Sequence, residues 1–174
     1  MTLLLRVLAY LDKRAAPTAL IGGMALAVHG VARATYDRDL LLTDRRVLDA
    51  KFWQQWSGGQ EPEIRIGDAD DPLAGVVSLH GDGTAVDLVV GREAWMARAI
   101  TRSTKVALPE GVIPVVDRGD LVALKLYAGG PQDLLDVALL LEADPNLRQL
   151  IEDRLPELPQ AICVAWNSIR AKQI

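Results

Sequence analysis

The chain has 174 residues, half of them hydrophobic, which suits one domain with a sizeable core. A formal net charge of −4 excludes a uniformly basic surface for polyanions, although a local basic patch is compatible with it. The single cysteine, Cys163, excludes an intrachain disulfide and a cysteine-based zinc site.

In chain order, the elements predicted for the first third are a helix at 2–15, a strand at 18–21, a helix at 24–29, a strand at 39–42 and a helix at 45–56. The first helix has apolar positions at helical spacing with Arg6 among them, so we expect an amphipathic helix and not a signal peptide. Gly22-Gly23 predicts a turn, and Thr43 or Asp44 suits the start of the third helix.

The middle of the chain predicts strands at 63–66, 75–80 and 84–90, a helix at 93–101, and a strand pair at 105–108 and 112–116. The Gly-Asp-Gly sequence at 81–83 is a strong hairpin signal. In the strand that follows, Asp87 lies on the face opposite Val86 and Leu88. A lone carboxylate in such an apolar strand is costly unless it is paired or bound to a metal.

The last third predicts helices only: 118–128 capped by Asp117, 131–142 after a Gly-Gly-Pro break, and two short helices ending near Arg170. The fold class is therefore α/β (α+β), a small mixed β-sheet flanked by helices. We expect a core at 1–116 and a C-terminal helical portion at 117–174 packed on it as a single compact unit. No apolar run approaches the ~18–20 residues that cross a bilayer, so we expect a cytoplasmic protein with no membrane partner.

Asp37 and Asp39 are the first candidates for chemistry. They are two residues apart at the head of a strand, so both carboxylates would project from the same face. Like charges held side by side repel each other, and a cation between them relieves the repulsion. With Asp87 on a neighbouring strand they would bind one or two Mg²⁺ ions, although an isolated Asp-x-Asp is also typical of turns and caps.

Further residues could hold phosphate. Glycines such as Gly22 and Gly23 before a helix let the backbone approach a phosphate, and they also form ordinary tight turns. Lys125, on a largely apolar helix, could reach a triphosphate or lie on a solvated face. Asp133 and Asp136 could cap their helix or pair with Lys125 or Arg33.

Other hydrolytic chemistry is not indicated. His29 and His80 are far apart, and neither lies in an H-x-x-H or H-E-x-x-H pattern, so a zinc hydrolase is unlikely on this sequence. No serine lies in a G-x-S-x-G setting, which argues against a serine hydrolase.

Taken in order, Gly22-Gly23, the Asp37-x-Asp39 pair and Asp87 resemble the polymerase-β-type nucleotidyltransferase superfamily. The block I-G-G-M-A-L-A-V-H-G-V-A-R-A-T-Y-D-R-D-L at 21–40 is similar to AbiEii-type toxin nucleotidyltransferases and their relatives. That group also has a Lys-containing helix followed by an Asp-x-x-Asp helix, here around Lys125 and at Asp133-x-x-Asp136.

The resemblance implies a nucleotidyltransferase fold and the transfer of a nucleoside monophosphate from a triphosphate to tRNA, a protein or a small molecule. Asp37, Asp39 and Asp87 would be catalytic and hold two Mg²⁺ ions, or Mn²⁺. It assigns nucleotide binding to Gly22, Gly23, Arg33, Lys125, Asp133 and Asp136. A toxin would also have an antitoxin partner. Two alternatives remain: a catalytically silent nucleotide-binding or interaction module of the same fold, and a metal-dependent phosphohydrolase.

Overall fold

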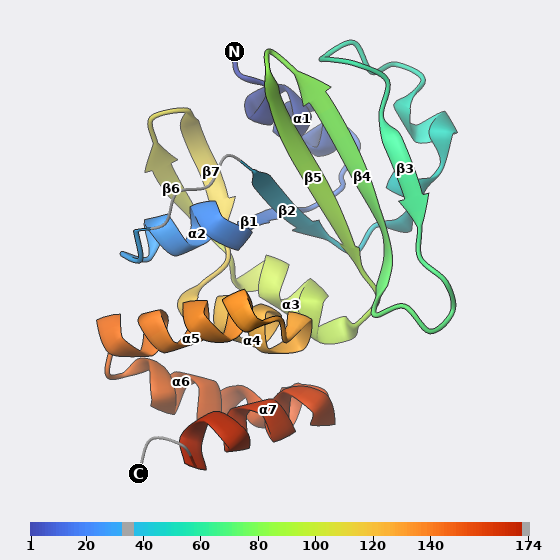
Figure 1. Ribbon diagram of the computed structural model, residues 1–174. Helices are drawn as coiled ribbons and strands as arrows, with labels where there is room; N and C mark the ends of the chain where they lie inside the picture. Colours follow the sequence, from blue (N-terminus) through green and yellow to red (C-terminus); the bar gives the residue numbers. More distant parts are fainter. Residues whose placement is uncertain (33–36, 172–174) are drawn as a thin grey trace. The chain divides into compact units, whose positions relative to one another are not determined.

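A seven-stranded mixed sheet organises the computed structural model, which describes residues 1–32 and 37–171 (Figure 1). The predicted fold class, a mixed sheet flanked by helices, is confirmed. The chain divides into two compact units, one made of residues 1–25 and 34–116 and the other of 26–33 and 117–174.

The sheet belongs to the first unit and has the strand order β3-β4-β5-β2-β1-β7-β6. Its strands are β1 Ala19–Ile21, β2 Arg38–Leu42, β3 Glu63–Ile66, β4 Leu73–Gly81, β5 Thr84–Gly91, β6 Thr104–Leu108 and β7 Gly111–Val115. β2 is parallel to β5 and antiparallel to β1, while β1 is parallel to β7. The parallel pairing of β2 and β5 brings together two segments nearly 50 positions apart in sequence, as the register Asp39↔Asp87 shows.

Side chains alternate along β4 and β5 between a buried and a more polar face, whereas all of β1 and the last three residues of β2 are buried. Leu40, Val77 and Leu88 are completely buried on one face. Helix α1, Leu3–Asp12, contacts β5, and the amphipathic pattern that predicted this helix supplies its buried side, including Leu4 and Val7. In Figure 1 this helix lies behind the sheet, so the opposite face is turned toward the viewer.

The β4–β5 hairpin closes through Asp82-Gly83. Both residues have positive φ angles, 55° and 70°, which is the backbone of a type I′ turn. Asp82 also accepts a hydrogen bond from the Arg6 side chain at 2.5 Å, so α1 holds the turn. The Gly-Asp-Gly signal thus placed this turn correctly.

The predicted helix at 45–56 is wrong. Two short 3-10 helices, η1 Arg45–Leu48 and η2 Ala50–Trp53, occupy the segment. Asp44 caps the first, as predicted. The break falls at Asp49, which has an extended backbone and accepts a hydrogen bond from the Lys51 N–H at 2.9 Å, so it caps the second helix instead of continuing the first.

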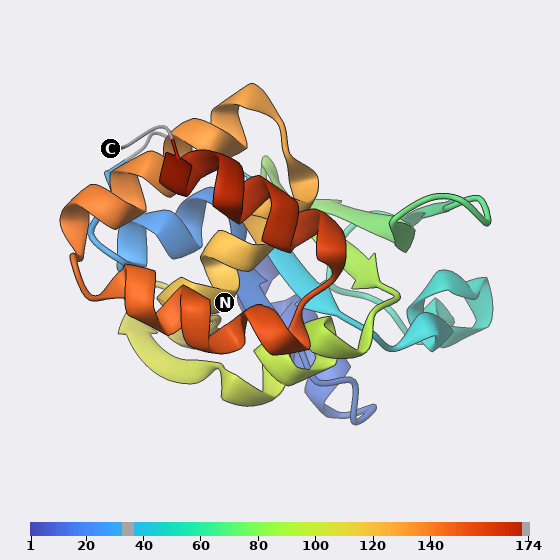
Figure 2. The same cartoon turned by 90° about the horizontal axis from the view of Figure 1, so that it is seen from below.

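Two further helices follow strands: α2 Gly22–Val28 after β1, and α3 Ala94–Arg102 after β5, where α3 contacts β2. The second unit contains α4 Arg118–Ala128, α5 Pro131–Ala143, α6 Leu147–Arg154, the 3-10 helix η3 Leu155–Glu157 and α7 Gln160–Ala171. α4 contacts α5, α6 and α7, and these helices lie together in Figure 2.

Charged groups fix the start of α4. Asp117 caps the helix through the Asp120 N–H and accepts two hydrogen bonds from Arg154 of α6, both 2.6 Å. The same guanidinium lies 3.1 Å from the fully buried Asp120. A two-pronged arginine–carboxylate pair of this kind has strong directional preference, so it ties α6 to the first turn of α4.

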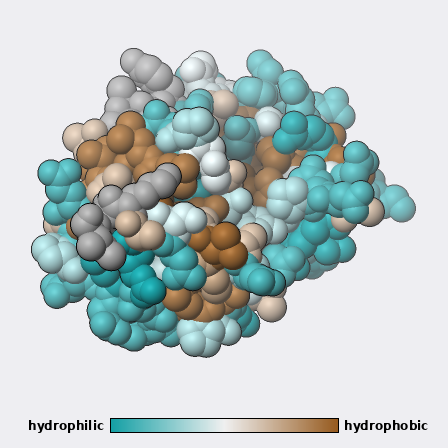
Figure 3. All heavy atoms as spheres, turned by 60° about the horizontal axis from the view of Figure 1, so that its bottom comes forward, coloured by the Kyte–Doolittle hydropathy of each residue, from teal (hydrophilic) through white to brown (hydrophobic). Residues whose placement is uncertain are grey.

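The surface carries some exposed apolar side chains. Leu134, Leu135 and Leu139 of α5 are between 37% and 52% exposed. Brown apolar groups interrupt the hydrophilic surface in the view of Figure 3. Among the helices of the described residues, none combines the length and apolar character that crossing a membrane requires.

Candidate functional site

Asp39 and Asp87 are direct neighbours in the sheet. The parallel register of β2 and β5 pairs the two residues, and paired residues of adjacent strands project from the same face. Adjacent strands lie about 4.8 Å apart, so two carboxylates are held side by side. Val86 and Leu88 are buried on the other face, as the sequence predicted.

Gly22 lies against the Asp39 carboxylate. It follows Ile21, which pairs with Asp39, and has a φ angle of +66°. A Cβ at this position would lie only 2.0 Å from the Asp39 Oδ2 atom. The elbow between β1 and α2 therefore needs glycine twice, for its left-handed backbone and for the close approach to the carboxylate. Gly23 is buried in the first turn of α2.

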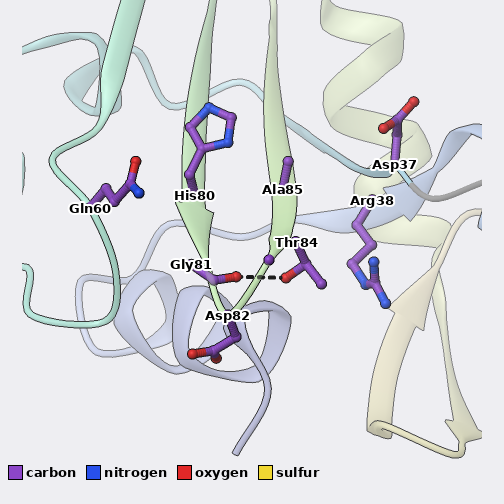
Figure 4. A pocket seen from close by; sticks show the side chains of 9 residues that line it. Asp37, Arg38, Gln60, His80, Gly81, Asp82, Thr84 and Ala85 are labelled. Carbon is purple, nitrogen blue, oxygen red and sulfur yellow. Dashed lines mark hydrogen bonds between the residues drawn. The ribbon is translucent and has the colours of Figure 1, made fainter.

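Asp37 is exposed just before β2 and lines a pocket of about 550 Å³. Its carboxylate and the Arg38 side chain point in opposite directions, and the His80 side chain of β4 points the same way as the Asp37 carboxylate (Figure 4). The other lining residues come from the β4–β5 hairpin and Gln60. The pocket belongs entirely to the first unit.

A second pocket, of about 390 Å³, contains Asp87. The register continues from Asp87 to Ser78 on β4 and to Glu63 on β3, so these side chains follow one another across the same face. His80, two residues from Ser78, has its Nε2 atom 3.9 Å from the Glu63 carboxylate. The face beside the paired aspartates is thus lined by hydrogen-bonding groups.

The sequence does not single out Ser78, Glu63 or His80 as site residues. The period-2 alternation of β3 and β4 was the available signal, because it puts these three residues on one side of their strands. Their connection to Asp87 depends on the strand register, which the local sequence does not determine.

The paired aspartates fit a magnesium ion by the chemistry of their donors. Mg²⁺ usually takes one or two protein carboxylates and completes its octahedron with water and substrate phosphates. Within the described ranges, 1–32 and 37–171, no three Asp, Glu, His or Cys side chains form a group that could hold a metal ion. A site made by Asp37, Asp39 and Asp87 together stays a prediction.

Lys125, Asp133 and Asp136 lie together in the helical unit. The Lys125 Nζ atom is 2.9 Å from Asp133 Oδ1 and 2.8 Å from the completely buried Asp136 Oδ2. Asp133 also caps α5 by accepting the Gly130 N–H, and Gln132 donates to Asp136. Both readings left open by the sequence, capping and pairing with Lys125, therefore hold at once.

The Lys125 side chain is only 12% exposed. Burial acts to lower its pKa, but the hydrogen bonds to Asp136 and Asp133 outweigh this effect, and the pKa is raised above its ordinary 10.5. Lys125 is therefore charged at neutral pH and engaged with two carboxylates. Arg33, the remaining predicted nucleotide contact, lies outside the described residues.

The fold is shared with solved nucleotidyltransferase structures. One is ANT(2")-Ia in complex with adenylyl-2"-tobramycin, with a TM-score of 0.55 and 15% identity over 99% of this chain and 97% of that chain. Another is an antigenic nucleotidyltransferase-like protein from Paracoccidioides brasiliensis, with a TM-score of 0.54 and 17% identity over 97% of this chain and 86% of that chain. At these identities the similarity establishes the fold.

No protein-family profile matches the chain, and no curated protein matches it.

Proposed function

We propose that this protein is a magnesium-dependent nucleotidyltransferase, which moves a nucleoside monophosphate from a nucleoside triphosphate to an acceptor. One observation carries the proposal: Asp39 and Asp87 are paired on adjacent parallel strands, with the backbone of Gly22 pressed against the Asp39 carboxylate. The fold shared with nucleotidyltransferases supports it.

Asp37, Asp39 and Asp87 would hold two Mg²⁺ ions, or Mn²⁺. When bound, such ions neutralise the phosphate charge and clamp the attacking and leaving oxygens. Gly22 and Gly23 would admit the triphosphate close to the backbone at the start of α2. Asp39, which Gly22 contacts, would then lie beside the phosphates.

In the transfer step, the acceptor hydroxyl oxygen attacks the α-phosphorus of the triphosphate. The bond from that phosphorus to the β-phosphate oxygen breaks, and pyrophosphate leaves with the electron pair. Asp87 would take the proton of the hydroxyl as general base. Ser78, the register neighbour of Asp87, would help to orient the hydroxyl.

Lys125, Asp133, Asp136 and Arg33 are secondary nucleotide contacts in this proposal. Lys125 already binds two carboxylates, so a phosphate would have to replace at least one of them. Its first role is therefore to join α4 to α5, and a phosphate contact would be added to that role.

The acceptor would be tRNA, a protein or a small molecule. ANT(2")-Ia, which has the same fold, was solved with an adenylylated aminoglycoside, so hydroxyl-bearing antibiotics belong in any acceptor panel. The resemblance of the sequence block at 21–40 to toxin nucleotidyltransferases supports the proposal that the protein is a toxin. Induced expression should then arrest growth in the wild type, and Asp39→Asn should abolish the arrest.

The decisive experiment incubates the protein with each α-labelled nucleoside triphosphate, Mg²⁺ and a panel of bulk tRNA, lysate protein and aminoglycosides. We expect label on one acceptor class and a loss of about 10³-fold or more in Asp39→Asn and Asp87→Asn. Asp153→Asn, on the exposed surface of α6, is the matched control and should transfer like the wild type.

Equal transfer by Asp39→Asn would refute the proposal. Blank transfer assays with a Mg²⁺-dependent rise in melting temperature on adding nucleotide would indicate the silent binding module, because a ligand stabilises the folded state by mass action. Release of phosphate without labelled acceptor would indicate a phosphohydrolase.

A further inference from the structure

Arg38 separates the two aspartates of the Asp-x-Asp sequence and points to the other side of the sheet (Figure 4). There its Nη2 and Nε atoms donate to Glu110 Oε1 at 2.7 and 3.3 Å. Glu110 lies in the turn between β6 and β7, 72 positions along the chain. Both side chains are only about one-fifth exposed.

The Arg38–Glu110 pair holds the first residue of β2, at a position that β1 does not reach. The last pair between β1 and β2 is Ile21↔Asp39, so Arg38 has β5 as its strand partner on one side and lies beyond β1 on the other. On that side the Arg38 side chain reaches the β6–β7 turn. The contact with Glu110 thus holds the backbone between Asp37 and Asp39 from the face opposite their carboxylates.

A buried carboxylate such as that of Glu110 is unfavourable in a contact that serves stability alone. Its second carboxylate oxygen, Oε2, is buried and has no hydrogen-bond partner among the residues that the structure describes. A buried acceptor without a partner loses its hydration and gains nothing in return. Apolar residues of similar volume are often as stable as a buried ion pair, so stability alone is a weak reason for this one.

We propose that Glu110 is a positioning residue for the aspartates. Its ion pair with Arg38 on the opposite face of the sheet keeps the side chains of Asp37 and Asp39 on the face that also carries Asp87. The same pair prevents the Arg38 guanidinium from turning back to pair with the aspartates. The inference rests on the proposed function, since the aspartates bind metal there. Its effect should appear in metal affinity and turnover more than in nucleotide affinity.

The test compares Glu110→Gln, Glu110→Ala and Arg38→Met with the wild type. Glu110→Ala should lower kcat on the order of 10- to 100-fold with little change in KM for the nucleotide. Glu110→Gln keeps an acceptor oxygen and should lose less. In the double variant with Arg38→Met and Glu110→Ala, the loss should be no larger than in either single variant, because both changes break the same contact.

Mn²⁺ binding, followed by electron paramagnetic resonance titration, supplies a readout that does not depend on turnover. Glu110→Ala should weaken Mn²⁺ binding about 10-fold or more, as is typical for residues that orient metal ligands. Glu152→Ala is the control, since it removes an ion pair with Arg170, 3.0 Å long, in the helical unit. Its Mn²⁺ affinity should equal that of the wild type.

Unchanged turnover and Mn²⁺ affinity in Glu110→Ala would overturn the inference, as would additive losses in the double variant. If Glu110→Ala fails to fold, Arg38→Met carries the test, because it removes the same contact, and wild-type turnover and Mn²⁺ affinity in that variant overturn the inference. A wild type that binds Mn²⁺ through Asp39 but transfers no nucleotide disproves the proposed function alone. A wild type that binds no Mn²⁺ disproves both.

Discussion

Gly22 is constrained both by its backbone conformation and by its contact with the carboxylate of Asp39. Its φ angle of +66° is one that other residues adopt at a cost of about 1–2 kcal/mol. The contact with Asp39 adds a second constraint, because a Cβ there would overlap the carboxylate oxygen. A side chain at this position must displace Asp39 or the elbow itself.

We expect Gly22→Ala to lose nucleotidyl transfer and Mn²⁺ affinity as well as stability. Gly129→Ala is the matched control, since Gly129 has nearly the same φ angle, +68°, and a Cβ there would meet only one atom, at an ordinary 3.7 Å. Urea unfolding should show the backbone cost of about 1–2 kcal/mol in both variants, and a further loss in Gly22→Ala, where the Cβ overlaps the Asp39 carboxylate. Full transfer by Gly22→Ala would contradict this role for the elbow.

Individual residues differed in how far the sequence could predict them. Asp87 could be placed on the more polar face of the sheet because its neighbours Val86 and Leu88 are apolar and belong to the buried face. Glu110 gave no such signal: it is one acid in a Pro-Glu-Gly turn, and its partner lies 72 positions away. Contacts of that range depend on strand order, which local patterns do not specify.

At the scale of elements, the α4–α5 pair depends on the charge of Lys125. Its raised pKa means that the folded state holds the proton more tightly than the unfolded state. This contribution to stability is fully present below the ordinary pKa of 10.5 and is lost as the pH rises through the folded-state pKa. Deprotonation leaves the completely buried Asp136 carboxyl group beside a neutral amine.

We therefore expect the free energy of unfolding to fall above about pH 10.5 more steeply in the wild type than in Lys125→Met. At neutral pH, Lys125→Met should cost about 3 kcal/mol, because it leaves a buried carboxylate without its cation. Urea titrations of both proteins between about pH 7 and 11 measure the two effects. Parallel pH curves would show that Lys125 does not carry the difference.

The elements themselves were largely predictable, and the exception has a local cause. The strands and hairpins carry alternation and turn residues, so their existence followed from the sequence. The segment at 45–56 has helix-forming residues on both sides of Asp49, and this aspartate used its side chain to start a new turn. An Asp side chain that competes with the helix backbone for hydrogen bonds gives only a weak signal in the sequence, yet here it ends one helix and begins the next.

At the scale of the molecule, α2 links the two compact units. It begins at Gly22, in the unit of the sheet, and its later residues from Leu26 belong to the unit of the C-terminal helices. Leu26 is completely buried. A helix that is continuous across the division should make the unfolding of the two units cooperative.

The variant Trp166→Phe tests this cooperativity. It removes the tryptophan of the helical unit, so fluorescence then reports Trp53, Trp56 and Trp95 of the sheet unit. Far-UV circular dichroism follows the helices of both units. The two signals should change at the same urea concentration, whereas two separate midpoints would show that the units unfold independently.

The path of the chain between the units also limits how the protein can be divided. The backbone passes from the sheet unit to the helical unit after residue 25, returns after 33 and leaves again after 116. A gene cut once after codon 116 would give a C-terminal fragment lacking the eight residues that α2 and the segment after it supply. Split-protein reporters or domain exchanges built on this scaffold would need to transplant that short internal stretch along with the tail.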